Sequence, residues 1–133
     1  MPESLELSIV LPVTAEEIFT AWLDSHIHGL LTGSPAQIDP QIGGVFTAWD
    51  GYIQGRTLDL IRNQRIVQSW RTSDFPTEAP DSILEIQIES IPDGARLTLV
   101  HKNIPDGQSG EYEQGWLDYY FAPMQAYYSQ AKS

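Results

Sequence analysis

Four large aromatic side chains, spread along the chain, are the residues best suited to hold an apolar molecule. They are Trp49, Trp70, Trp116 and Tyr120, and Met124 follows Tyr120 one helical turn later. Aromatic rings bury large apolar areas, whether they line a pocket or fill a core. Both roles remain open, because they are compatible in a sheet that packs on a helix.

His101 is the polar group best placed to anchor such a molecule. It alternates with Leu97 and Leu99 along a segment of strand character, so we expect its side chain to face inward. In a cavity it would serve as a polar contact, an acid or a base. The alternative is a core histidine bonded to a neighbour, which is the better reading of one polar group by itself.

Arg71 follows Trp70 and could meet an acidic group of a ligand at the mouth of the cavity. An ion pair with one of the many surface carboxylates is the commoner use of such an arginine. The predicted ligand-binding set comprises Trp49, Trp70, Arg71, His101, Trp116, Tyr120 and Met124.

We predict no metal, no cofactor and no catalytic residue. His26 and His28 would share a face with Asp24 in a strand, but this segment is more typical of a helix or loop. The chain has no cysteine, which excludes disulfides and thiolate chemistry. It also lacks a nucleophile elbow, a phosphate-binding glycine loop and a dinucleotide fingerprint.

A long C-terminal helix must position several of these residues. The segment from Glu111 to Ala131 has apolar residues about every four positions, which predicts a helix with one aromatic face. Pro123 would either end that helix near Phe121 or kink it, and we favour the kink because the apolar row keeps its phase. The row comprises Tyr112, Trp116, Leu117, Tyr120, Phe121, Met124, Tyr127, Tyr128 and Ala131.

The first part of the chain predicts a strand followed by two short helical segments. Apolar residues alternate over residues 5–11, and Pro12 ends the strand. Thr14 and Glu17 form a capping box for an amphipathic helix that ends near Leu23. Residues 24–33 are predicted to be a second short helix or an ordered loop.

Short strands joined by turns follow, which predicts an antiparallel meander. Gly55 indicates a bulge or bend in one of them. The fold class is therefore α+β, with a curved antiparallel sheet of about six to seven strands wrapped on the long kinked helix. The candidate strands are residues 36–39, 45–49, 52–61, 66–71, 83–91 and 95–102.

Charge narrows the range of partners. The chain has 18 acidic and 7 basic residues and a formal net charge of −11. Such a chain repels phosphate backbones and anionic membranes, so we expect no nucleic-acid partner. The N-terminus has neither a signal peptide nor a membrane span, and we expect a cytoplasmic protein with a single domain, residues 1–133.

Several short segments, in this order and spacing, resemble one protein family. The segments are GGVF (43–46), DG (50–51), Gly55, DL (59–60), RIV (65–67), WR (70–71), IP (104–105), GW (115–116) and YYF (119–121). Together they are similar to the C-terminal domain of the Hsp90 ATPase activators, within the START and birch-pollen-allergen (SRPBCC) helix-grip superfamily.

The resemblance implies a helix-grip fold with a cavity between sheet and helix. We expect a non-catalytic protein that binds a small apolar or amphipathic ligand. One alternative is a cyclase or aromatase that uses His101 to move a proton. Another is a domain that contacts a chaperone, although the eukaryotic activators use a separate N-terminal domain there and this chain starts at the first strand. The oligomeric state is left open.

Overall fold

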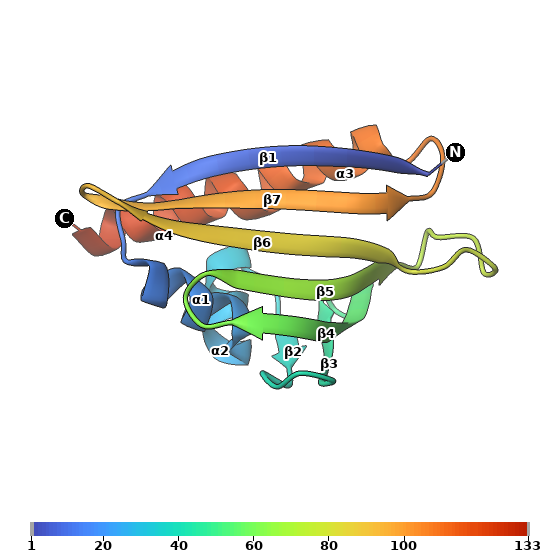
Figure 1. Cartoon of the computed structure of the whole chain (residues 1–133), viewed down its shortest axis with the longest axis horizontal. Helices are drawn as coiled ribbons and strands as arrows, with labels where there is room; N and C mark the ends of the chain where they lie inside the picture. Colours follow the sequence, from blue (N-terminus) through green and yellow to red (C-terminus); the bar gives the residue numbers. More distant parts are fainter. Residues whose placement is uncertain (1, 133) are drawn as a thin grey trace.

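The computed structural model describes residues 2–132, and the side chains of residues 2–129. A curved sheet of seven antiparallel strands packs against helices on one of its sides (Figure 1). The strands are β1 (Glu3–Leu11), β2 (Ala36–Ile38), β3 (Val45–Ala48), β4 (Ile53–Ile61), β5 (Arg65–Thr72), β6 (Ser82–Ile91) and β7 (Gly94–Ile104). The helices are α1 (Ala15–Leu23), α2 (Ser25–Thr32), α3 (Ser109–Trp116), the π-helical turn η1 (Leu117–Phe121) and α4 (Ala122–Lys132).

The sheet is a meander to which the first strand is added at one edge. Its order is β1-β7-β6-β5-β4-β3-β2, and every neighbouring pair is antiparallel. Because β1 and β2 lie at opposite edges, α1 and α2 carry the chain from one edge to the other. This arrangement confirms the predicted α+β helix-grip architecture.

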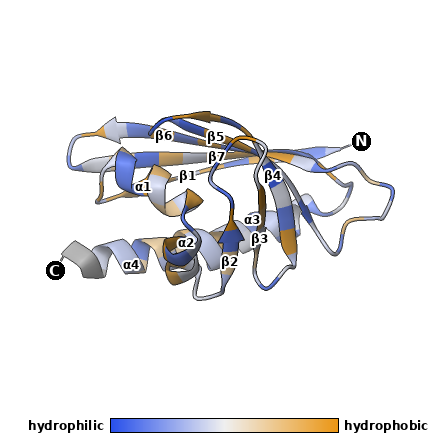
Figure 2. Cartoon of the chain, turned by 90° about the horizontal axis from the view of Figure 1, so that it is seen from below, coloured by the Kyte–Doolittle hydropathy of each residue, from blue (hydrophilic) through white to orange (hydrophobic). Residues whose placement is uncertain are grey.

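The C-terminal helix lies along the concave side of the sheet, where α3 and α4 both contact β1. Figure 2 shows the helices on one side, with β2 and β3 curving down beside α2 and α3. Among the described helices, none combines the length and the hydropathy needed to cross a lipid bilayer.

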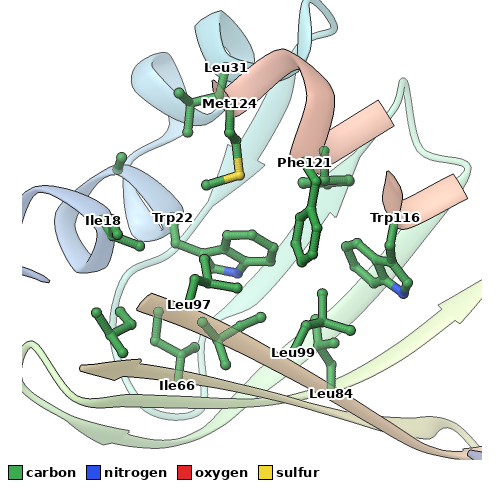
Figure 3. Close-up of a cluster of buried hydrophobic side chains, with 14 of the residues drawn as sticks. Ile18, Trp22, Leu31, Ile66, Leu84, Leu97, Leu99, Trp116, Phe121 and Met124 are labelled. Carbon is green, nitrogen blue, oxygen red and sulfur yellow. The ribbon is translucent and has the colours of Figure 1, made fainter. Parts of the chain in front are cut away.

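The hydrophobic core fills the space between the sheet and these helices. Figure 3 shows side chains from β5, β6 and β7 facing side chains from α1, α2 and the C-terminal helix. Burying each large apolar side chain stabilises the fold by roughly 1.5–3 kcal/mol. The labelled core residues are Ile18, Trp22, Leu31, Ile66, Leu84, Leu97, Leu99, Trp116, Phe121 and Met124.

Local capping explains where the two short helices begin. The hydroxyl of Thr14 accepts a hydrogen bond from the Glu17 amide at 3.1 Å, which confirms the predicted N-cap of α1. The carboxylate of Asp24 accepts one from the Ile27 amide at 2.9 Å and caps α2 in the same way. The segment 24–33 is therefore a helix, which ends at Gly33 in the left-handed conformation.

The C-terminal helix continues through Pro123, as predicted, and a widened turn precedes the proline. The Ala122 amide donates to the Leu117 carbonyl, five residues back. In a regular α-helix, each residue lies about 40° further around the helix axis than the residue four positions before it. A turn that contains an extra residue shifts the following residues back in the opposite direction. Tyr112, Trp116, Tyr120, Met124 and Tyr128 are therefore all buried.

The predicted apolar row was wrong at two positions. Leu117 is 38% exposed and Tyr127 is 37% exposed. Neither residue belongs to the series from Tyr112 to Tyr128 in steps of four, which is the series that the widened turn keeps against the sheet. Phe121 is buried, as predicted.

The role predicted for Gly55 as a bulge is also wrong. Gly55 pairs regularly with Phe46 and Trp70, and the register shift lies between Thr57 and Asp59. A Cβ at position 55 would lie 1.9 Å from the Ser69 carbonyl oxygen and 2.7 Å from the Phe46 ring. The strand needs glycine there because its neighbours approach so closely.

Candidate ligand-binding pocket

A pocket of about 370 Å³ opens between the β3–β4 turn, the strands β4 and β5, and the C-terminal helix. This volume lies within the range of small-molecule sites. Most of the lining side chains are aromatic. The pocket is lined by Trp49, Tyr52, Ile53, Trp70, Glu111, Tyr112, Gly115, Trp116, Tyr119 and Tyr120.

Trp70 is at the centre of the aromatic wall because β5 alternates strictly and directs it inward. Its ring lies 5.1 Å from Tyr112 at 82° and 5.5 Å from Trp116 at 41°. On another side, Trp49 meets Tyr119 at 5.4 Å and 64°. Rings inclined to one another at these angles do not form one continuous stack. They border a shared space instead.

Trp49 is held in an unusual backbone conformation. Its φ is 54°, and Asp50 (59°) and Gly51 (87°) continue the left-handed turn. A large side chain in this region costs roughly 1–2 kcal/mol, so the surrounding structure must impose it. The turn brings the Trp49 ring to the pocket, and its buried Nε1–H has no hydrogen-bond partner among the described residues.

His101 lies behind the pocket and holds Trp116 in place. The Trp116 Nε1–H donates to His101 Nδ1 at 3.1 Å, so the proton of the neutral imidazole is on Nε2. That nitrogen donates to the Ser82 hydroxyl at 2.8 Å, which donates to the Trp70 carbonyl at 2.6 Å. Burial lowers the pKa of His101 to about 3, so the ring stays neutral near pH 7.

His28 supports Tyr120 in a similar way. Its Nδ1 donates to the Trp22 carbonyl at 2.9 Å, so Nε2 accepts the Tyr120 hydroxyl proton at 3.0 Å. Burial lowers the pKa of His28 and raises that of Tyr120. No local pattern indicated this link, because it joins residues from distant parts of the chain.

Two tyrosines are oriented at the mouth of the pocket. The Tyr52 hydroxyl donates to the Asp74 carboxylate. The Tyr112 hydroxyl donates to the Gln108 side chain at 2.8 Å and is bonded to Thr72 at 2.6 Å. Burial is the main cause that raises the pKa of both tyrosines, so both are neutral at pH 7.

The structure brings four of the seven predicted ligand-binding residues to this pocket: Trp49, Trp70, Trp116 and Tyr120. Met124 is 1% exposed and packs in the core (Figure 3). His101 is fully buried behind the aromatic wall. Ligand contact at any of the seven stays a prediction.

Arg71 points away from the pocket and makes the ion pair expected of a surface arginine. Its guanidinium lies 2.8 Å from the Asp81 carboxylate. It also donates to the carbonyls of Pro76 and Ala79 and lies 5.4 Å from the centre of the Phe75 ring. These contacts tie the β5–β6 loop to the outer face of β5.

Six pocket residues were not predicted. Tyr112 belonged to the recognised apolar row, so its periodicity was a usable signal. Tyr119 and Gly115 border the pocket only because the helix meets the sheet at this angle, which no local pattern shows. Among the described residues, no cluster of His, Cys, Asp or Glu is suited to a metal ion. The six are Tyr52, Ile53, Glu111, Tyr112, Gly115 and Tyr119.

The family model "Activator of Hsp90 ATPase homolog 1-like protein" matches residues 12–129. The chain belongs to this family. The match spans nearly the whole fold, from the end of β1 into α4, and confirms the resemblance drawn from the sequence.

Curated relatives are about a quarter identical to this family member over the aligned residues. An uncharacterised Schizosaccharomyces pombe protein is 28% identical over 110 residues, which are 83% of this chain and 32% of the relative. The human activator of 90 kDa heat shock protein ATPase homolog 1 is 26% identical over 80% of this chain and 31% of its own. The chain thus spans about a third of the length of these relatives.

Solved structures of similar size match along most of their length. An HSP90 activator from Plasmodium falciparum is 26% identical, with a TM-score of 0.86 over 92% of this chain and 94% of that chain. A Chromobacterium violaceum protein is also 26% identical, with a TM-score of 0.77 over 96% and 98%. Both comparisons support the helix-grip fold.

Proposed function

We propose that this chain binds a small apolar or amphipathic molecule in the aromatic pocket between β4, β5 and the C-terminal helix. The observation that carries the proposal is a pocket of about 370 Å³ whose walls are mainly aromatic. Pockets of this size and apolar character are the usual sites of small ligands.

The walls are also fixed before any ligand arrives. His101 holds Trp116, His28 holds Tyr120, and Gln108 holds Tyr112. A ligand would therefore not have to order these side chains, which lowers the entropic cost of binding. This preorganisation supports a role of the aromatic side chains in ligand binding, in addition to their role in the hydrophobic core.

Binding without turnover is the better proposal than proton-transfer catalysis. His101 and His28 each use both ring nitrogens in buried hydrogen bonds, and neither lines the pocket. The partners of His101 are a serine and a tryptophan, neither of which titrates near pH 7. A cyclase or aromatase that used His101 would need this ring to reach the ligand.

The proposal is tested by filling the pocket without damaging the fold. Gly115 lines the pocket, and the nearest atom to an added Cβ would be 3.9 Å away, on Tyr119. Gly115→Leu should therefore fit, and it should stabilise the helix by up to about 1 kcal/mol. We expect it to abolish binding of the neutral probe N-phenyl-1-naphthylamine, followed by fluorescence.

The matched control is Gly110→Leu on the same helix. An added side chain there meets open space, and Gly110 does not line the pocket. This variant should bind the probe like the parent chain. If the parent chain shows no saturable binding, or if Gly115→Leu binds equally well, the proposal is wrong.

A second candidate function is contact with an Hsp90-type chaperone. It is favoured by the likeness to the Plasmodium falciparum HSP90 activator, which this chain matches over 94% of that chain. We propose that the chain stimulates chaperone ATP hydrolysis, measured by phosphate release as the chain is titrated in. An unchanged rate together with no association in ultracentrifugation would rule it out. The expected cytoplasmic location stays a prediction.

A further inference from the structure

We infer that the molecule held in the aromatic pocket is an organic cation with an alkylated ammonium group. The inference rests on the proposed function, because it names the class of ligand for the same pocket. Three features of the pocket lead to it: the aromatic walls, the charge at the mouth and the hydrogen bonds that the buried wall hydroxyls already make.

The walls provide an unusual density of ring surface. Seven of the ten lining residues are aromatic. Each ring face carries negative partial charge and attracts a cation within about 6 Å, more strongly where water is excluded. A neutral apolar ligand would be held equally well by aliphatic side chains, which here contribute only Ile53.

The charge at the mouth has one sign. Glu111 is the charged residue among those that line the pocket, and no ion pair in the described part of the chain neutralises it. The Asp74 carboxylate is nearby, because it accepts the Tyr52 hydroxyl. With a formal net charge of −11, the chain repels carboxylates and attracts cations.

The two buried hydroxyls of the walls already make hydrogen bonds, which distinguishes between kinds of cation. The Tyr120 hydroxyl is bonded to His28, and the Tyr112 hydroxyl to Gln108 and Thr72. A primary ammonium carries three N–H donors and needs acceptors for them when it is buried. A fully alkylated ammonium has no N–H group, so the ring faces and Glu111 satisfy it.

An isosteric pair of probes separates charge from shape. Phenyltrimethylammonium and tert-butylbenzene have the same size and outline, and only the first is charged. Three tryptophans line the pocket, so a change in the intensity or wavelength of tryptophan fluorescence reports binding of either probe. We expect the cation to bind at least about fivefold more tightly, as about 1 kcal/mol of cation–ring attraction requires.

Two substitutions test the residues assigned to the charge. Glu111→Gln and Tyr119→Leu should each lower the preference for the cation over tert-butylbenzene by roughly two- to fivefold. Tyr119 is 58% exposed, so its replacement should not unfold the chain. The matched controls are Glu113→Gln and Tyr127→Leu, exposed residues of the same helix that do not line the pocket, and they should leave the preference unchanged.

Each outcome is decisive. If tert-butylbenzene binds as tightly as the cation, the inference about charge is wrong while the proposed function stands. If neither probe binds, both are wrong. An effect of Glu113→Gln as large as that of Glu111→Gln would attribute the preference to net charge alone and overturn the pocket assignment.

Discussion

His101 shows how a buried polar residue can shape a site that it does not line. Its hydrogen bonds run from Trp116 on the helix to Ser82 on β6 and on to the backbone of β5. The ring therefore connects the two sides of the pocket. Its inward direction was predictable from strand parity, but its partners were not, because they depend on how the helix lies on the sheet.

We expect His101→Phe to destabilise the fold on the order of 1–3 kcal/mol, because the Trp116 Nε1–H is left buried without an acceptor. Urea unfolding measures the change. In the double variant His101→Phe with Trp116→Phe the orphaned donor is gone, so its loss should be smaller than the sum of the two single losses.

Strict additivity of these losses would contradict the assigned bond. His26→Phe is the control, because His26 is exposed on α2. Its effect should not exceed about 0.5 kcal/mol.

At the scale of the elements, β4 has no room for a side chain at Gly55. An added methyl group would overlap the Ser69 carbonyl and the Phe46 ring. We predict that Gly55→Ala destabilises the fold by roughly 1–3 kcal/mol through overpacking. It should also weaken probe binding, because Gly55 pairs with Trp70.

Gly110→Ala is the comparison for that variant, measured by urea unfolding. Its site is open and helical, so it should stabilise the fold by up to about 1 kcal/mol. Equal stability of the two variants would show that the close approach at Gly55 does not constrain the strand.

Periodicity predicted most of the elements but few of the pocket contacts. The alternation in β6 and β7 and the Thr14 cap are local signals, and each is confirmed. The widened turn η1 is a different case, because a row of every fourth residue over five turns exceeds what a regular helix keeps on one face. That excess was visible in the sequence, but we interpreted the row as one face of a regular helix and did not predict the π-helical turn.

For the whole molecule, the buried histidines make stability depend on pH. The ordinary pKa of histidine is about 6.5. The folded-state pKa of His101 is about 3, and burial lowers that of His28 too. Below about pH 6.5 the unfolded chain therefore binds protons that the folded chain does not. The free energy of unfolding should fall by up to about 1.4 kcal/mol per pH unit for each buried histidine.

Urea unfolding between about pH 6.5 and 5 measures this slope, above the ordinary range of the carboxylates. His101→Phe should make the slope shallower, whereas His26→Gln should not change it. If the free energy of unfolding did not change across this pH range, the histidines of the folded chain would bind protons as readily as those of the unfolded chain, and the prediction would be wrong.

The pairing of β1 with β7 has a consequence for synthesis of the protein. Leu5 lies opposite His101, so most of the chain separates the two partners in sequence. On the ribosome β1 emerges long before β7 is synthesised, so the apolar residues of β1 stay exposed to water until β7 can pair with them. The local hairpins from β4 to β7 are then the natural starting point of folding, and β1, although it is made before the other strands of the sheet, is among the last to be placed.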